Sequence, residues 1–172
     1  MSKIKETKSQ VSQTINIRKI LGRSPTEAEK QSIGQALIDR IIDRTESGKG
    51  LNGKNLKSPY SDAYADSLDF KAFGKSKNKV NMTLTGDMLA SIDILSSTRD
   101  TITIGIEGDE APKAFNHQTG DTVPKRRFFG VTRKDIQTAV SNNEGPSDPS
   151  EQSSFVDRAL SVLLESFEDG ES

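Results

Sequence analysis

The segment Thr101-Ile102-Thr103-Ile104-Gly105-Ile106 places the strongest constraint on the fold, because every second residue is isoleucine. Successive side chains of a strand point to opposite faces, so this alternation predicts a strand with one apolar and one polar face. Such strands are typical of antiparallel sheets that cover a core on one side only. Residues 94–97 predict a neighbouring strand, joined to the first through residues 98–100.

Two further segments complete the predicted sheet. Val80, Met82 and Leu84 alternate with polar residues and predict a strand over 80–84. Residues 127–131 predict a short strand in which one of Phe128 and Phe129 faces a core and the other the opposite side. The fold class that follows is α+β: a small antiparallel β-sheet from these four segments, with helices packed on one face.

Capping patterns predict where the helices begin. Ser24, Pro25 and Glu27 have the spacing of an N-cap, a first helical position and a capping box. The helix that follows carries a core-facing stripe and is expected to end at Gly48 and Gly50; the stripe comprises Ile33, Leu37 and Ile41.

Three more helices are predicted along the chain. Ser58-Pro59 is expected to open a helix that places Tyr60 and Tyr64 on one face as half-buried anchors. Thr85 is expected to cap a helix that carries Met88, Leu89 and Ile92. Thr132 and Asp135 have the spacing of a capping box, which predicts a helix over 132–141.

The two ends of the chain differ in character from its middle. Residues 1–22 fit neither the helix nor the strand period and are predicted to form an N-terminal arm, outside a core domain of residues 23–141. Residues 142–152 are rich in proline, glycine and serine and predict a linker. Residues 153–172 predict a C-terminal amphipathic helix, which either folds back or docks on a neighbour; its apolar stripe comprises Val156, Leu160, Leu163, Leu164 and Phe167.

Charge is distributed unevenly, although the net charge is −1. Residues 1–57 hold 12 Lys and Arg against 6 Asp and Glu, whereas residues 142–172 hold 1 against 8. These ends belong to one solvated surface, or the basic region of one subunit faces the acidic end of the next, as head-to-tail rings allow. The chain has no cysteine, no apolar run of membrane-spanning length and no signal-peptide core, so we expect a soluble protein made in a cytoplasm, without a membrane partner.

The stretch from Ala114 to Gly130 concentrates the unusual residues, including His117, the only histidine. Gly120 and Pro124 predict a loop, in which His117 is expected to bond loop backbone and Arg126 to hold a carboxylate or carbonyl. Phe128 and Phe129 are expected to supply apolar burial and one interface anchor. One histidine with a nearby carboxylate is too small a set for zinc, and no nucleophile motif is present, so neither catalysis nor a cofactor or metal is expected.

Three pieces of the sequence resemble one protein family. They are His117-Gln118-x-Gly120 with Val123-Pro124-x-Arg126-x-Phe128-Phe129-Gly130; the segment 80–92, which contains Leu84-Thr85-Gly86 and Met88; and residues 56–59 with Tyr60 and Tyr64. The pattern resembles the phage virion morphogenesis (tail completion) family of Mu-like phages, and the related neck and head–tail joining proteins of long-tailed phages. Arg127 stands where that family often has proline.

The resemblance implies a structural virion protein, assembled in the host cytoplasm, that forms a homo-oligomeric ring of about six subunits at the neck or head-proximal end of the tail. Its partners would be further copies of itself, the tail tube or head connector proteins, and DNA passing through the ring. Two alternatives remain open at this point. A DNA-contacting connector would line a channel with Lys49, Lys54, Lys57 and the 75–79 loop, and a hydrolase would use His117.

Overall fold

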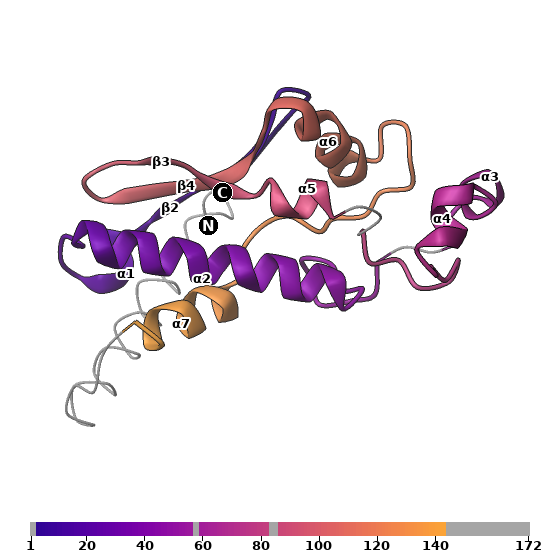
Figure 1. Ribbon diagram of the computed structural model, residues 1–172. Coiled ribbons are helices and arrows are strands. Elements are labelled where there is room, and N and C mark those ends of the chain that lie inside the picture. The colour runs from indigo at the N-terminus through magenta and orange to yellow at the C-terminus, as the bar shows by residue number, and fades with distance from the viewer. Residues whose placement is uncertain (1–2, 57–58, 83–85, 144–172) are drawn as a thin grey trace, which may run out of the picture.

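The computed structural model describes residues 3–56, 59–82 and 86–143, and these form an α+β fold around one antiparallel sheet, as the sequence predicts (Figure 1). Its four strands are β1 (Ile4–Thr7), β2 (Gln10–Asn16), β3 (Asp93–Ser97) and β4 (Thr101–Glu107). They lie in the order β1-β2-β4-β3. The hairpin of β3 and β4 was predicted with its turn, and a bulge between Ile94 and Ser96 shifts its register.

The N-terminal residues are part of this sheet, and the prediction of an arm over 1–22 is wrong. β2 pairs along its whole length with β4, so that Val11 lies opposite Ile106 and Ile15 opposite Ile102. The apolar alternation in β2 is interrupted by Gln13, which faces inward and is buried. Its Oε1 accepts a hydrogen bond from the main-chain nitrogen of Val131 at 2.9 Å, so a polar side chain occupies a core position of the strand.

Residues 127–131 are buried and do not form the predicted strand. No neighbouring strand pairs with them: the carbonyl of Arg127 accepts from the main-chain nitrogen of Leu51 at 2.7 Å, and the groups that follow bond to side chains. The Gln118 amide donates to the carbonyl of Phe129 and accepts from its nitrogen, both at 3.2 Å. Arg44 Nη2 donates to the carbonyls of Phe128 and Gly130, at 3.0 and 2.7 Å.

This arrangement also corrects the expectation that the two phenylalanines face opposite environments. Phe128 and Phe129 are both fully buried, and their rings meet edge to face with centroids 6.4 Å apart. Both sides of the segment are core, because α2 lies on one side and α6 on the other, as the contacts of Arg44 and Gln118 show. The predicted strand at 80–84 is also not formed over residues 80–82, and Leu84 lies outside the described residues.

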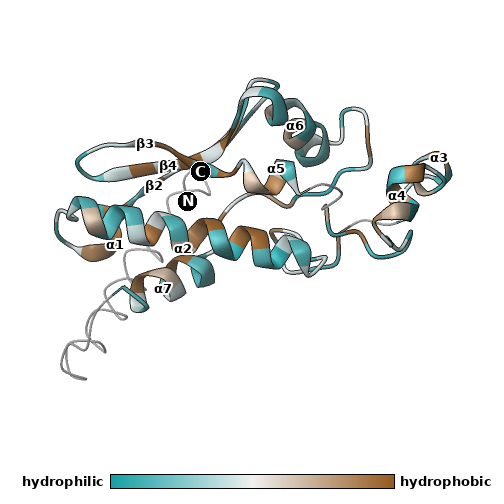
Figure 2. Ribbon diagram, viewed as in Figure 1, coloured by the Kyte–Doolittle hydropathy of each residue, from teal (hydrophilic) through white to brown (hydrophobic). Residues whose placement is uncertain are grey.

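The long helix α2 (Glu27–Glu46) covers the isoleucine face of the sheet (Figure 2). Its predicted stripe of Ile33, Leu37 and Ile41 is buried. Its cap lies two residues later than predicted: Thr26 is the N-cap, and Glu29 completes the capping box by accepting from the Thr26 nitrogen at 2.7 Å.

The remaining helices are shorter: α1 (Ile17–Leu21), α3 (Asp62–Ala65), α4 (Leu68–Ala72), α5 (Asp87–Ala90), the 3-10 turn η1 (Gly108–Glu110), α6 (Ala111–Thr119) and α7 (Arg133–Ser141). The capping box of Thr132 and Asp135 before α7 is confirmed. Of the described helices, none has the length and apolar character that a bilayer crossing requires.

Two helix starts differ from the prediction. Tyr60 precedes α3, whose N-cap is Ser61, so the two tyrosines do not share a helix face. Their rings still meet, with centroids 5.2 Å apart. The N-cap position of α5 is Gly86, with φ of 88°, and Thr85 lies outside the described residues.

Residues 59–79, which contain α3 and α4, form a lobe that projects from the body of the molecule (Figure 1). Tyr60, Tyr64 and Phe70 pack against one another within it, and the nitrogen of Tyr60 donates to the carbonyl of Lys77 at 3.1 Å. The predicted linker from residue 144 on, and the predicted helix of Val156, Leu160, Leu163, Leu164 and Phe167, lie outside the described residues.

Candidate functional site

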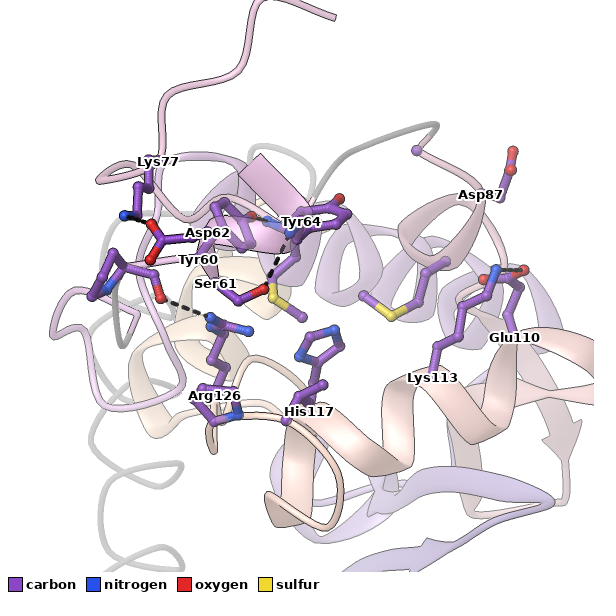
Figure 3. Close-up of a pocket in the computed structure, with 16 residues that line it drawn as sticks. Tyr60, Ser61, Asp62, Tyr64, Lys77, Asp87, Glu110, Lys113, His117 and Arg126 are labelled. Atoms are coloured by element: carbon purple, nitrogen blue, oxygen red, sulfur yellow. Dashed lines mark hydrogen bonds and ion pairs between the residues drawn. The ribbon is translucent and has the colours of Figure 1, made fainter. Parts of the chain in front are cut away.

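A cavity of about 730 Å³ lies where the lobe meets the body (Figure 3). Four parts of the chain line it: residues 59–62, Tyr64 and Lys77 of the lobe; Met82 with residues 86–88; Glu110 with Lys113 and His117 of α6; and Val123, Pro124 and Arg126. These parts are far apart in the sequence. Its volume falls in the range of roughly 300–1,000 Å³ that is usual for ligand pockets, so the cavity is large enough to accept several side chains of a partner.

Helix α6 lies between the cavity and the sheet, and its two faces have different surroundings. Ala111, Ala114 and Gln118 are buried against the body of the protein. Lys113 and His117, four residues apart on the other face, line the cavity, and the helix N-cap Glu110 lies beside them. His117 was predicted to lie in a loop, whereas it belongs to the last turn of this helix. The loop begins at Gly120, the helix C-cap, whose φ is 83°.

The opposite wall of the cavity is aromatic and carries one buried cation. The Arg126 guanidinium lies over the ring of Tyr60, 5.1 Å from its centroid, and Nη2 approaches the carbonyl of Pro59 at 3.5 Å. A cation over an aromatic face is stabilised by the ring quadrupole, the more so when it is shielded from water. Arg126 is only 4% exposed, so it fixes residues 123–126 to the base of the lobe. The expected bond from Arg126 to a main-chain carbonyl is thereby observed.

The imidazole of His117 is held neutral. Burial and the nearby positive charge of Arg126 lower the pKa of His117 to about 4. Nδ1 is buried and has no hydrogen-bond partner among the described residues, which contradicts the expectation that the ring bonds loop backbone. The main-chain carbonyl of His117 makes that link instead, accepting from the nitrogen of Arg126 at 2.7 Å.

Other charged groups at the cavity are mostly paired. Lys113 Nζ contacts Glu110 Oε1 at 2.6 Å, and Lys77 pairs with Asp62. The second carboxylate oxygen of Glu110, Oε2, is buried without a partner in the described part of the chain. Burial also raises the pKa of the Tyr64 hydroxyl. The cavity therefore combines apolar walls with charged groups that are mostly paired, and the two polar atoms without a described partner, Glu110 Oε2 and His117 Nδ1, are buried.

The residues singled out from the sequence fall into three sets. Gly86, Met88, His117, Pro124 and Arg126 line the cavity. Phe128, Phe129 and Gly130 lie in the core behind it, and Gly120 ends α6. Leu84 and Thr85 lie outside the described residues.

Glu110 and Lys113 were missed as members of the site. Pro112 within the first turn of a helix, followed by His117 at helical spacing from Lys113, is the signal that could have identified them.

The geometry offers little for catalysis. Ser61 Oγ accepts from the nitrogen of Tyr64 at 3.3 Å, as the cap of α3, and no hydrogen bond joins it to His117. A hydroxyl nucleophile needs a base within hydrogen-bond reach. Over the described ranges no group of three or more His, Cys, Asp or Glu side chains is placed to hold a metal ion. The described side chains of the cavity present apolar surface and hydrogen-bonding groups.

Comparison with known proteins adds no relative: no family model, no curated protein and no solved structure matches the chain. Inference about its role therefore depends on the residues quoted above and on how the fold arranges them. The spatial relation of the three motif pieces is the relevant observation. Residues of all three pieces meet at one cavity, although they are spread over more than a third of the chain: Tyr60 and Tyr64; Met82 with residues 86–88; and His117 with Val123, Pro124 and Arg126.

Proposed function

We propose that the chain is a structural protein of a bacteriophage particle. It forms a homo-oligomeric ring at the neck or head-proximal end of the tail, as a tail completion, tail terminator or head–tail joining protein, and contacts tail tube or head connector proteins. The observation that carries the proposal is the convergence of all three family-like pieces on the cavity. A chance match of short motifs has no reason to bring its pieces together in space.

Exposed apolar side chains on the lobe support assembly. Leu68 is 85% exposed and Phe73 is 56% exposed, and both belong to the same projecting segment. Single apolar residues on a surface are ordinary, but two on one projection leave apolar area that a neighbouring subunit would cover. Association that removes this apolar area from water lowers the free energy of the chain.

The alternative of a DNA-contacting connector has weaker support. Lys77 of the 75–79 loop pairs with Asp62, and Lys75 Nζ donates to Asn81 at 2.8 Å. Lys54 and Lys79 are exposed and Lys57 lies outside the described residues, whereas Lys49 is engaged by Asn55. Side chains held in this way have less freedom to neutralise phosphates, the interaction that gives DNA binding its salt dependence. The hydrolase alternative would need a nucleophile bonded to His117, and none is seen among the described residues.

Native mass spectrometry of the full chain, with negative-stain electron microscopy of the same sample, tests the proposal. We expect one discrete multiple near six subunits and ring-shaped particles with a central opening. A chain that remains monomeric at every concentration contradicts the ring. Duplex DNA binding that weakens steeply with salt, without ring formation, would instead favour the connector.

A further inference from the structure

We propose that the acidic segment of residues 144–172 of one subunit docks on a basic surface of the next copy of the chain, at the end of α2. This inference rests on the homo-oligomer proposed above and names two surfaces that would join neighbouring subunits. The contact is heterologous, because a segment of one subunit meets a different surface of the other. Contacts of this kind close into rings when the rotation between subunits permits.

Three segments that are far apart in the sequence form the basic surface, which we call the basic end. They are residues 47–56, 74–80 and 123–127, and together they contain eight lysine and arginine residues and no aspartate or glutamate. The main-chain nitrogen of Leu51 donates to the carbonyl of Arg127 at 2.7 Å, which joins the first segment to the third. A Cβ on Gly48 would lie 3.1 Å from the carbonyl oxygen of Val80, so the second segment lies directly against the first.

Half of these cations are exposed and have no carboxylate partner in the described part of the chain: Lys54, Lys79, Lys125 and Arg127. Among the others, Lys77 pairs with Asp62. Glu46, the last residue of α2, lies at the margin of the surface and acts on the charge of Lys75. These two carboxylates offset only part of the positive charge, so the basic end attracts a partner that carries several negative charges.

The chain itself contains a segment of opposite charge. Residues 144–172 have a net charge of −7, whereas residues 1–143 have a net charge of +6. The acidic residues are Glu144, Asp148, Glu151, Asp157, Glu165, Glu168, Asp169 and Glu171, and Arg158 is the one basic residue among them. Opposite charge on two surfaces speeds their encounter and disfavours wrong partners. A single-stranded nucleic acid fits less well, because the three basic segments contain no aromatic residue on which a base could stack.

The direction of α7 favours the basic end of a neighbour over that of the same subunit. Asp135, in the first turn of α7, contacts Arg44 Nη1 at 2.7 Å, near the end of α2. From that point α7 runs back along α2, away from the basic end (Figure 1). Its nine residues carry the chain about 13 Å in that direction before the acidic segment begins. A head-to-tail arrangement brings this side of one subunit to the basic end of the next.

The first test identifies the contact in the native chain by carbodiimide crosslinking, which joins a lysine amine directly to a carboxylate. Unlabelled chains and chains labelled with heavy nitrogen are mixed in equal amounts at high salt, which weakens charge contacts, and are then returned to low salt. Peptide mass spectrometry should find Lys54 or Lys79 joined to acidic residues of 144–172, with mixed-label pairs as frequent as same-label pairs. Pairs that always carry a single label would place the segment on its own subunit and overturn the inference, as would crosslinks from these lysines to other carboxylates only.

The second test reverses the charges and follows assembly by native mass spectrometry of the full chain. One variant combines Lys54→Glu with Arg127→Glu in the basic end, and the other combines Glu165→Lys with Glu168→Lys in the acidic segment. Each should raise the dissociation constant of the assembly at least about 30-fold, because attraction becomes repulsion. An equal mixture of the two variants should assemble again, since the reversed segment of one then meets the reversed surface of the other.

The matched control combines Lys19→Glu with Arg99→Glu, which also changes one exposed lysine and one exposed arginine. These residues lie at the opposite end of α2, where Lys30 Nζ donates to the carbonyl of Thr98 at 2.6 Å. The control should assemble normally. Because Lys54 and Arg127 are exposed, their variant should keep the circular dichroism spectrum of the wild type.

The outcomes separate this inference from the proposed function. A ring that persists in either reversed variant overturns the docking and leaves the ring in place. A Lys54→Glu, Arg127→Glu chain that still forms rings but loses binding to duplex DNA assigns the basic end to DNA and also overturns the docking. Loss of the ring in each variant, with recovery in their mixture, supports both. A wild-type chain that never assembles overturns both.

Discussion

The main chain of Phe129 depends on one side chain, and this dependence can be measured. Gln118 is fully buried and both donates to and accepts from Phe129, at 3.2 Å in each direction. Replacing Gln118 by methionine preserves most of the volume and leaves a buried N–H and a buried C=O without partners. Each group left unsatisfied costs about 1–3 kcal/mol, so Gln118→Met should lower the free energy of unfolding by about 2–6 kcal/mol.

Urea unfolding followed by far-ultraviolet circular dichroism measures this loss. For a domain of this size a slope of about 2 kcal/mol per molar urea is reasonable, so a loss of about 4 kcal/mol moves the midpoint by about 2 M. Gln35→Met is the matched control, because Gln35 is an exposed helix residue whose side chain bonds only Asp39 on the same helix, at 2.8 Å. Losing such a surface pair should cost no more than about 0.5 kcal/mol.

If Gln118→Met shifts the urea midpoint no further than Gln35→Met does, side chains do not substitute for strand pairing along residues 127–131. A shift accompanied by a changed slope would mean that the substitution alters the compactness of one state, so the comparison is made at equal slope. Both substitutions exchange glutamine for methionine within a helix, so helix propensity cancels between them.

Three further predictions follow from buried groups. The pKa of His117 is about 4 when folded and 6.5 when free, so its contribution to stability is complete only above about pH 7.5. The free energy of unfolding should fall by about 2 kcal/mol between about pH 7.5 and about pH 5, and His117→Gln should abolish this loss in urea titrations. Arg44→Met removes the buried partner of Asp135 at 2.7 Å and should lower the free energy of unfolding by about 3–5 kcal/mol. Arg40→Met loses only an exposed contact to the same carboxylate at 3.8 Å, and should lower it by less than about 1 kcal/mol in the same assay. Phe129→Glu buries a charge in the core and should abolish the cooperative thermal transition, so a folded variant would contradict its burial.

Local sequence signals predicted the elements that depend on local interactions. The alternation of Ile102, Ile104 and Ile106 and the capping box of Thr132 and Asp135 each involve residues within a few positions of one another. The start of α2 was placed two residues early because Ser24 and Thr26 both precede a glutamate at cap spacing. Only tertiary contacts decide between two equivalent caps.

The strands β1 and β2 could not be recognised because of a long-range contact. Gln13 occupies an inward position of β2, and its partner is the nitrogen of Val131. From the sequence alone, a glutamine at that position argues against an apolar strand face. Only its partner, more than a hundred residues later, explains why it is buried. Pairing across that distance leaves no periodic trace in the sequence.

The same reason explains why residues 127–131 were predicted to be a strand. An extended buried segment has the same composition whether its main chain bonds to a strand or to side chains, so Phe128 and Phe129 give no indication of which occurs. The side chains that take the role of the neighbouring strand, those of Arg44 and Gln118, come from two different helices. Their role appears only when both helices are placed.

For the candidate site too, the sequence identified residues, whereas only the tertiary structure shows where each of them lies. The resemblance singled out the stretch from His117 to Gly130, in which Phe128 and Phe129 were expected to supply apolar burial and one interface anchor. The fold separates it: Arg126 lines the cavity, whereas Phe128 and Phe129, two and three residues later, are fully buried in the core. A charge at Phe129 therefore tests folding, and a charge at Leu68, which no motif contains, tests assembly. Residues of the family-like motif line the cavity or lie in the core behind it, whereas the exposure of Leu68 on the lobe is visible only in the fold.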